Sequence, residues 1–399
     1  MTHDVVDYVI VGGGLAGLYY GYLLRTHRPS ASFLILEAES HFGGRAFDVR
    51  FGSLTVPAGA GLGRFTQDRL LRTLMTDLGL PVETFPVRHA YSPRIRPVDI
   101  PTRFTELKRA LATSTDDASR VSFRTLARAV WGPAVYEDFL RFNGYRDMER
   151  EDARETLSHY HIQDNYTRWT AFRVRWNDLT RTLCAAIGPT HLRTRQPVHA
   201  ITRATDGTFR VKTRSVWTYT CRHVILACPI PVVQRLLPQH SSLYQGIGVQ
   251  PFLRTYVQFD PASAAIVQRY IPQTTVVSNA LQKIIPMDAQ RGVYMIAYAD
   301  NRNAVAVRAL GPKALAAAVV REFRIPESLR IVRLRHCFWQ IGTHYYRPLS
   351  VRFASRVSFR RQAQAPEPGI RVIGESVSTN QGWVEGALET ARAAFFSTI

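Results

Sequence analysis

The chain has 399 residues, 46% of them hydrophobic, and carries a net charge of +20 from 51 basic and 31 acidic residues. This length is too great for one ordinary core, and the hydrophobic content excludes general disorder. All but four of the basic residues are arginine, and residues 330–361 hold eight arginines and no acid. That segment would attract an anionic partner or nucleic acid. No nucleic-acid-binding motif accompanies it, so a solvated basic face is the favoured interpretation.

The sequence shows no targeting signal and no cysteine pattern typical of disulfides or metal sites. We find no signal-peptide pattern and no apolar run of about 18 residues that would cross a bilayer, so we expect a soluble, cytoplasmic protein. The four cysteines have neither metal-ligand nor disulfide-framework spacing. We therefore expect buried, reduced thiols and no metal site.

The first periodic stretch, from Asp7 to Glu37, is a strand, a glycine-rich turn, a helix and a second strand at 33–37, which together form a βαβ unit. Residues 88–175 are more charged and aromatic, with helical stretches at 104–111 and 123–131, and this change is typical of an inserted domain. Strand patterns then return at 198–201, 209–213 and 223–228.

A second, mainly antiparallel sheet is predicted from strand patterns at 252–259, 274–278, 293–298 and 331–339, with a helix at 313–323 between them. A strand at 370–373 and a helix at 383–396 follow. The sequence thus predicts an α/β protein, α+β overall, in which a Rossmann-like nucleotide-binding domain carries an inserted substrate domain of mixed sheet and helices. We place the nucleotide-binding domain at 1–80, 185–240 and 362–399, and the substrate domain at 81–184 and 241–361.

The glycines after the first strand fit the pattern G-x-G-x-x-G at Gly12, Gly14 and Gly17. Gly12 permits the tight turn, Gly14 lets a pyrophosphate approach the backbone, and Gly17 lets the helix pack close to the strand. The helix N-terminus, with Leu15 and Ala16 in its first turn, offers N–H groups and partial positive charge to phosphate. The pattern therefore predicts dinucleotide binding.

Two further signals indicate which dinucleotide binds. Glu37 follows Gly17 by about 20 residues, the spacing of an acid that binds a ribose hydroxyl, and an acid here disfavours a 2′-phosphate. The block Gly43-Gly44-Arg45 brings backbone close to a ligand and adds a charge for phosphate.

A block at 374–387, beginning Gly374-Glu375, follows a strand and opens the final helix. The positive end of that helix suits the pyrimidine edge of a flavin, which becomes anionic on reduction. FAD is thus favoured over NAD.

Together these blocks resemble the flavin-containing amine oxidase superfamily, which includes monoamine, polyamine and L-amino-acid oxidases. Looser similarity lies at 56–61, where the superfamily brings a Gly-Ala turn beside the flavin, and at 197–201, where a valine meets the adenine end through its backbone. The resemblance implies that FAD is held by Gly12, Gly14, Leu15, Ala16, Gly17, Glu37, Gly44, Arg45, Gly59, Ala60, Val198, Gly374, Glu375, Trp383 and Val384.

The activity that the resemblance implies is that of an FAD-dependent oxidoreductase. A hydride leaves the carbon of an amine or amino-acid C–N bond for flavin N5, and O2 reoxidises the flavin and yields H2O2. The protein itself orients the substrate and excludes water.

Four residues are candidates for the catalytic end. Trp383 and Tyr345 stand where many members flank the substrate with two aromatic rings, which would hold an amine by stacking and cation–π attraction. His344 lies near the place where monoamine oxidases carry a flavin-linked cysteine; the favoured interpretation is a hydrogen-bonded or substrate-facing histidine. Arg254 stands where many members carry a lysine that holds a water near flavin N5.

Arginine keeps the charge of that lysine but is planar and does not titrate. With Arg254 at this position, a dehydrogenase or a degenerate enzyme is an alternative to an oxidase. Lys283 is expected to face outward from a strand, the alternative being the cleft. The strongly basic chain disfavours cationic polyamines and favours a substrate with a carboxylate. Two other functions remain: another FAD oxidoreductase of the same fold, porphyrinogen oxidase- or desaturase-like, or a degenerate FAD-bound protein with a basic binding face.

Overall fold

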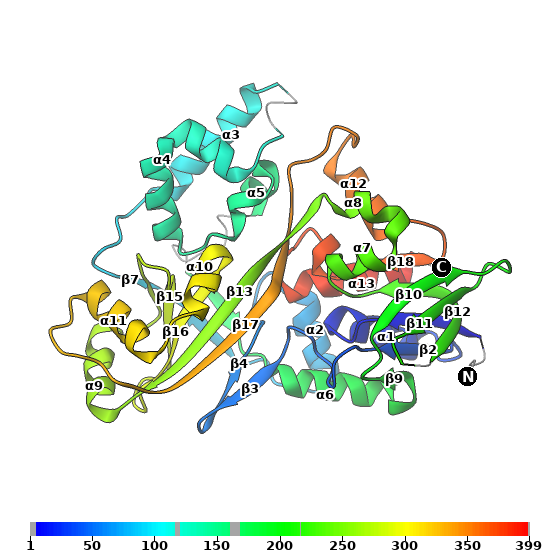
Figure 1. Cartoon of the computed structure of the whole chain (residues 1–399), viewed down its shortest axis with the longest axis horizontal. Coiled ribbons are helices and arrows are strands. Elements are labelled where there is room, and N and C mark those ends of the chain that lie inside the picture. The colour runs from blue at the N-terminus through cyan, green and yellow to red at the C-terminus, as the bar shows by residue number, and fades with distance from the viewer. Residues whose placement is uncertain (1–4, 116–119, 160–167, 216, 398–399) are drawn as a thin grey trace.

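The computed structural model describes residues 5–115, 120–159, 168–215 and 217–397. Two large sheets, flanked by helices, lie side by side, and a separate group of helices stands at one end (Figure 1). The sheets are joined by two long strands that run from one to the other.

The first sheet combines the beginning, middle and end of the chain. Its strands are β1 (Val6–Val11), β2 (Phe33–Leu36), β9 (Leu192–Arg193), β10 (Val198–Arg203), β11 (Phe209–Thr213), β12 (Thr218–Leu226) and β18 (Ile370–Val372). The order is β10-β11-β12-β1-β2-β9, and β18 pairs with β12. The pairs that flank β1 are parallel, whereas β10, β11 and β12 are antiparallel to one another. This confirms the Rossmann-like fold assembled from distant segments.

The apolar run of β1 is buried on both faces, as expected for a parallel strand covered by helices. Ile10 faces α1 (Leu15–His27), α6 (Trp176–Ile187) and α13 (Val384–Phe396). Val9 and Val11 face the opposite core, to which α7 (Ile230–Leu236) and α12 (Arg356–Gln364) contribute.

The second sheet is antiparallel except at its β14–β7 edge, as predicted. In order across the sheet its strands are β17 (Ile331–Tyr346), β13 (Ile247–Phe259), β16 (Val293–Asp300), β15 (Lys283–Asp288), β14 (Thr275–Val276) and β7 (Ala90–Tyr91). Its core is closed by α9 (Pro261–Tyr270), α10 (Asn301–Arg308) and α11 (Pro312–Phe323).

Strands β13 and β17 extend beyond this sheet. At their far ends Ile247 pairs with Tyr346, and both side chains are buried in the core of the first sheet beside Val9 and Leu226. Their ladder is interrupted between Gln250 and Phe252. Pro251 lies at this break and has no N–H to donate.

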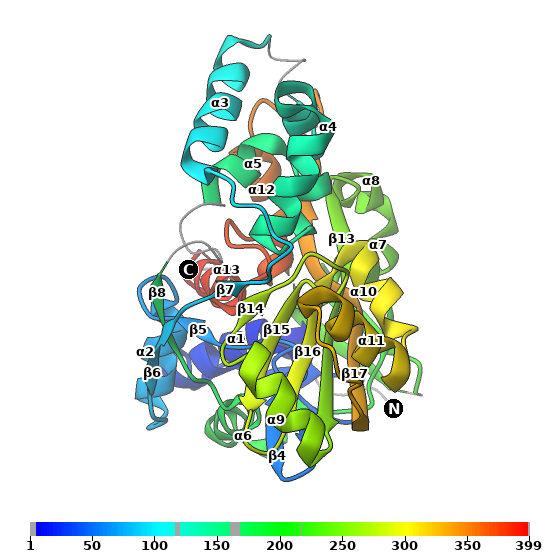
Figure 2. The ribbon, with the colours of Figure 1, turned by 90° about the vertical axis from the view of Figure 1, so that its left-hand side faces the viewer.

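The helices α3 (Ile100–Thr113), α4 (Phe123–Asn143) and α5 (Ala153–His159) form a group with its own core, built on Phe104, Phe123 and Phe139. Figure 2 shows this group standing above both sheets. The other elements are β3 (Asp48–Phe51), β4 (Leu54–Pro57), β5 (Gly63–Arg64), α2 (Arg69–Asp77), β6 (Thr84–Val87), η1 (Asp147–Arg150), β8 (Trp169–Phe172), η2 (Pro189–His191), η3 (Pro238–His240), α8 (Ser241–Tyr244) and η4 (Glu375–Val377).

The predicted strands and helices are present, with shifted ends: the strand predicted at 274–278 is only two residues long, and the one predicted at 331–339 continues to Tyr346. The domain limits remain predictions. The limit between 184 and 185 falls inside α6, whose buried face packs against α1, so we propose placing it before Trp176.

All four cysteines are free thiols; Cys221 and Cys337 are buried and the other two are half-buried. Burial raises the pKa of the Cys184 thiol to about 11 and that of Cys221 to about 12. In the described ranges, no helix combines the length and the apolar character that a bilayer crossing requires.

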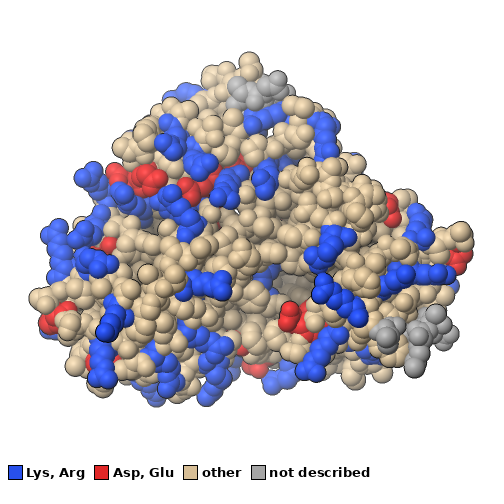
Figure 3. All heavy atoms as spheres, viewed as in Figure 1, with Lys and Arg blue, Asp and Glu red and all other residues tan. Residues whose placement is uncertain are grey.

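The basic segment at 330–361 is partly neutralised. Arg356 pairs with Asp152 at 2.9 Å and with Glu155 at 3.3 Å, and Arg360 pairs with Glu155 at 3.4 Å. Lys and Arg side chains are otherwise spread over the visible face, with few acids among them (Figure 3).

The carboxylate of Glu385 serves as the N-terminal cap of α2, because its two oxygens accept the N–H groups of Leu70 at 2.7 Å and Leu71 at 3.0 Å. Replacing Glu385 with Ala should lower the free energy of unfolding by about 2–3 kcal/mol, since two buried donors lose their acceptor. Glu327, in an exposed pair with Arg269, is the control, and its change to Ala should cost less than about 1 kcal/mol. Urea denaturation measures both; equal losses would refute the capping role.

Candidate functional site

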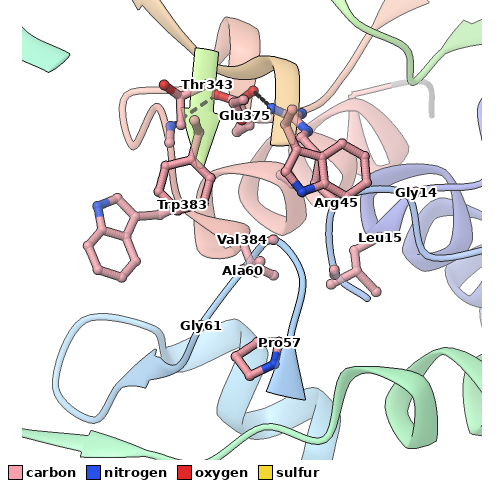
Figure 4. Close-up of a pocket in the computed structure, with 18 of the residues that line it drawn as sticks. Gly14, Leu15, Arg45, Pro57, Ala60, Gly61, Thr343, Glu375, Trp383 and Val384 are labelled. Carbon is pink, nitrogen blue, oxygen red and sulfur yellow. Dashed lines mark hydrogen bonds and ion pairs between the residues drawn. The ribbon is translucent and has the colours of Figure 1, made fainter. Parts of the chain in front are cut away.

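A cavity of about 1810 Å³ lies where the two sheets meet. One part of its wall comes from β1, β2 and β10 of the first sheet, and another from β13, β15, β16 and β17 of the second. Every predicted site residue except Gly17 lines this space. Figure 4 draws 18 of the lining residues, among which Gly14, Leu15 and Trp383 are labelled.

The glycine loop is built as its spacing predicts. Gly12 has φ 112°, and a Cβ there would lie 2.4 Å from the carbonyl oxygen of Ala227. A Cβ on Gly17 would lie 2.0 Å from the carbonyl oxygen of Gly12, so Gly17 serves helix packing rather than the cavity wall. A Cβ on Gly14 would meet no atom within 4 Å. Since Gly14 begins α1 without a side-chain cap, the first N–H groups of the helix remain available to an anion.

Glu37 lies at the end of β2 on the same wall. Its carboxylate accepts the N–H of Gly13 at 2.7 Å and that of Glu39 at 2.9 Å. Each oxygen keeps a lone pair for a hydroxyl donor, so these bonds orient the group toward a ribose without exhausting it.

Glu375 is a buried charge that three partners hold in the site. It is 6% exposed, and its carboxylate contacts Arg45 Nη1 at 2.7 Å, His344 Nδ1 at 2.5 Å and the N–H of Gly382 at 3.0 Å. Burial alone would raise the pKa of Glu375, but the contacts with His344 and Arg45 outweigh it and hold that pKa far below the usual range. The residue is therefore a carboxylate.

Arg45 joins this carboxylate to the second sheet, because the same Nη1 also donates to the carbonyl of Gly342 at 2.8 Å. Gly342 lies in the stretch of β17 where pairing with β13 is broken, which leaves its carbonyl for the arginine. The Arg45 side chain keeps 31% exposure toward the cavity.

His344 has both ring nitrogens engaged. The N–H of Ile230 points at Nε2 from 3.2 Å and can only donate to it, so the proton lies on Nδ1 and is given to Glu375. The side chain is fully shielded from solvent. His344 therefore orients Glu375, which agrees with the favoured interpretation of a hydrogen-bonded histidine. Neither nitrogen is free for the alternatives, a contact with substrate or a covalent link to a flavin.

The predicted aromatic pair has other contacts. The guanidinium of Arg64 stacks on Trp383 with its carbon 3.8 Å from the ring centroid, and Asp68 holds that guanidinium from 2.6 Å. Tyr345 packs over Gly248, where a Cβ would lie 2.2 Å from the ring. Part of each ring surface is thus covered, and the cage for an amine stays a prediction.

Arg254 projects from β13 and is 4% exposed. Its Nε donates to the carbonyl of Gly59 at 2.6 Å, next to the predicted Gly59-Ala60 turn, and its guanidinium lies over the ring of Tyr298 at 4.6 Å. The same ring has Phe252 at its edge, with centroids 5.0 Å apart.

Lys283 faces the cavity, so the expectation of an outward lysine is wrong. The residue is 4% exposed, and its Nζ donates to Tyr145 Oη at 2.7 Å and lies 5.2 Å from the Tyr298 centroid. The reason is the preceding Gln282, which adopts φ 58° and whose amide bonds to Asp300 at 3.1 Å. That turn directs the first side chain of β15 inward.

Several lining residues were not identified from the sequence: Arg64, Tyr145, Tyr298 and Asp300. Arg64 lies just beyond the Gly59-Ala60 turn and the other three lie far along the chain from the glycine blocks, and none belongs to a spaced motif. The only available signal was the polar Asp300 at the end of an apolar strand.

Changing Glu375 to Gln tests this network. Because the folded-state pKa lies below the ordinary 4.5, the carboxylate stabilises the fold fully above that value, and the stabilisation is lost as pH falls through the folded-state pKa. The variant should be less stable by about 2 kcal/mol near neutral pH, and the difference should shrink toward about pH 3. Denaturation curves at several pH values measure it; a gap that does not change with pH would contradict the ionised buried carboxylate.

Comparisons with known proteins agree with this geometry. A sequence profile described as flavin containing amine oxidoreductase matches residues 102–394, and one for an NAD(P)-binding Rossmann-like domain matches residues 10–78. The flavin-containing amine oxidase A of Equus caballus is 39% identical over 88 residues. That alignment spans 22% of this chain and only 16% of the horse protein.

Solved structures match over nearly the whole chain. Putrescine oxidase bound to putrescine superposes with a TM-score of 0.74 at 15% identity, covering 100% of this chain and 99% of that one. Cyclohexylamine oxidase from Brevibacterium oxydans gives a TM-score of 0.72 at 14% identity, covering 99% and 98%. At this identity the likeness concerns the fold. Since the family profile spans most of the chain, this protein belongs to the flavin-containing amine oxidoreductases, and its cofactor is FAD.

Proposed function

We propose that this protein oxidises the C–N bond of a small amine or amino acid, with O2 as the final acceptor and H2O2 as a product. One observation carries the proposal: the glycine loop and the cluster of Arg254, Lys283 and Tyr298 open onto the same cavity. A nucleotide cofactor and a small-molecule substrate would therefore contact each other inside this cavity.

The residues present suit FAD. The open space at Gly14, the uncapped start of α1 and the carboxylate of Glu37 would hold its pyrophosphate and ribose, with Arg45 beside them. Gly59, Ala60, Gly374, Trp383 and Val384 line the remainder, and Val198, which also lines the cavity, would meet the adenine. When bound, FAD supplies the hydride acceptor of the reaction.

The chain's own part is to position substrate and exclude water. Phe252, Tyr298 and Trp383 provide apolar surface on the cavity wall. The fixed charge of Arg254 cannot act as a proton carrier, because guanidinium stays protonated. Arg254 also favours a second candidate, a dehydrogenase that passes electrons to an acceptor other than O2.

The cofactor site is tested by a matched pair of glycines. Gly14 and Gly311 each precede a helix with extended φ and ψ, and a Cβ at either would meet nothing within 4 Å. Only Gly14 lines the cavity. Gly14→Val should weaken FAD binding by about 100-fold or more, because the side chain occupies the space of the phosphates, whereas Gly311→Val should not change it. Titration of apoprotein with FAD measures both, and equal affinities would refute the assigned position.

The flavin should be released from the native protein by acid, because His344 has no nitrogen free for a covalent link. The visible spectrum of the supernatant after acid precipitation checks this. Yellow colour that stays with the pellet would contradict the role given to His344.

Turnover is tested on the flavin-loaded protein with panels of amines and amino acids, by peroxide detection and, in parallel, with an artificial electron acceptor. We expect peroxide with at least one compound that carries an amine. Reduction of the artificial acceptor without peroxide would favour the dehydrogenase, and no flavin reduction by any amine would refute the proposed activity.

A further inference from the structure

The inner end of the cavity is built around two buried cations. Arg254 and Lys283 are each 4% exposed, both line the cavity, and both lie over the ring of Tyr298. Among the residues that the structure describes, Arg254 donates to the Gly59 carbonyl and to the sulfur of Met295, contacts the Tyr256 hydroxyl and forms no ion pair. A buried guanidinium without a carboxylate partner is a strong attractor for an anion.

The aromatic rings that would receive an ammonium group are already in contact with protein cations. Arg64 stacks on Trp383 at 3.8 Å, Arg254 on Tyr298 at 4.6 Å, and Lys283 lies 4.4 Å from the centroid of Tyr145. A second positive group on a substrate would meet repulsion here instead of cation–π attraction.

The nearby acids do not cancel this field at Arg254. Both oxygens of Asp300 accept the N–H of Arg146, at 3.0 and 3.1 Å, and one also accepts the Gln282 amide. Asp68 is bound to Arg64. Asp147 also lines the cavity. Beyond the effect of burial, its negative charge raises the pKa of the Tyr298 hydroxyl, whereas the positive charge of Arg254 lowers it.

We propose that the substrate carries an anionic group, of the carboxylate type, that binds beside Arg254 and Lys283, and that diamines and polyamines without such a group are excluded. This inference rests on the proposed oxidation of an amine. Two protein cations at the end of the cavity would repel the second ammonium group of a diamine.

The test uses the flavin-loaded protein and has two arms. Isothermal titration calorimetry compares benzoate with benzyl alcohol, a pair that differs in charge and that the enzyme does not need to oxidise. Steady-state assays compare ornithine with putrescine, which lacks only the carboxylate. We expect benzoate to bind at least about tenfold more tightly than benzyl alcohol, and ornithine to have the larger kcat/KM.

Variants assign the effect to the two cations. Arg254→Met and Lys283→Met should each weaken benzoate binding by about tenfold or more, whereas Arg254→Lys, which keeps the charge, should weaken it less. Arg308→Met is the matched control, because Arg308 is an exposed arginine stacked on Phe338 at 4.3 Å outside the cavity, and its loss should leave binding unchanged. Circular dichroism confirms that each variant is folded.

The outcomes separate the two ideas. Benzoate binding that depends on Arg254, in a protein that oxidises no amine, would support the anion site and refute the proposed function. Oxidation of putrescine in preference to ornithine would uphold the function and overturn the anion site. Benzoate binding that is absent, or equal in all variants, would also overturn it.

Discussion

The buried carboxylate of Glu375 is the interaction on which the rest of the site depends. It draws on Arg45 from the N-terminal segment, His344 from the second sheet and the Gly382 N–H from the last loop before α13. A charge removed from water this completely is stable only when each partner is in place. The position of β17 against the first sheet, the orientation of His344 and the exposed side of Arg45 are therefore fixed together.

The sequence predicted well those features that depend on neighbouring residues in the chain. The glycine loop, Glu37 and the block at 374–387 owe their function to backbone turns and helix ends, and their meaning is carried by spacing within a few residues. The sheets could be predicted for the same reason, since each strand shows its own apolar pattern. Fold class and cofactor thus followed from short stretches of chain.

What the sequence could not predict was set by contacts between distant segments. Lys283 turns inward because Gln282 takes a positive φ and binds Asp300, and nothing in the residues around Lys283 signals that. His344 is engaged because Ile230, far away in the chain, aims its N–H at it. Arg64 reaches Trp383 only after β5 and the last loop are packed together. Such roles depend on tertiary packing rather than on a motif.

The excess of arginine has a structural use besides solubility. Arg64, Arg146 and Arg254 are each less than 10% exposed, and they bind carbonyls, carboxylates or aromatic faces. Guanidinium suits such places because it is planar, weakly hydrated and offers several donors at once. Part of the net charge is therefore internal, and it shapes the cavity as much as the outer face.

The strands β13 and β17 have a mechanical consequence. The two strands continue from one half of the molecule into the other. Their pairing begins at Ile247–Tyr346 in the first core and ends at Phe259–Ile331 in the second. A hydrogen-bonded ladder anchored in two cores resists hinge bending, and its break at Pro251 is held by Arg45 on Gly342. The ladder should therefore oppose a rigid-body opening of the two halves. Exchange of the deeply seated dinucleotide would then require local unfolding and should be slow compared with turnover.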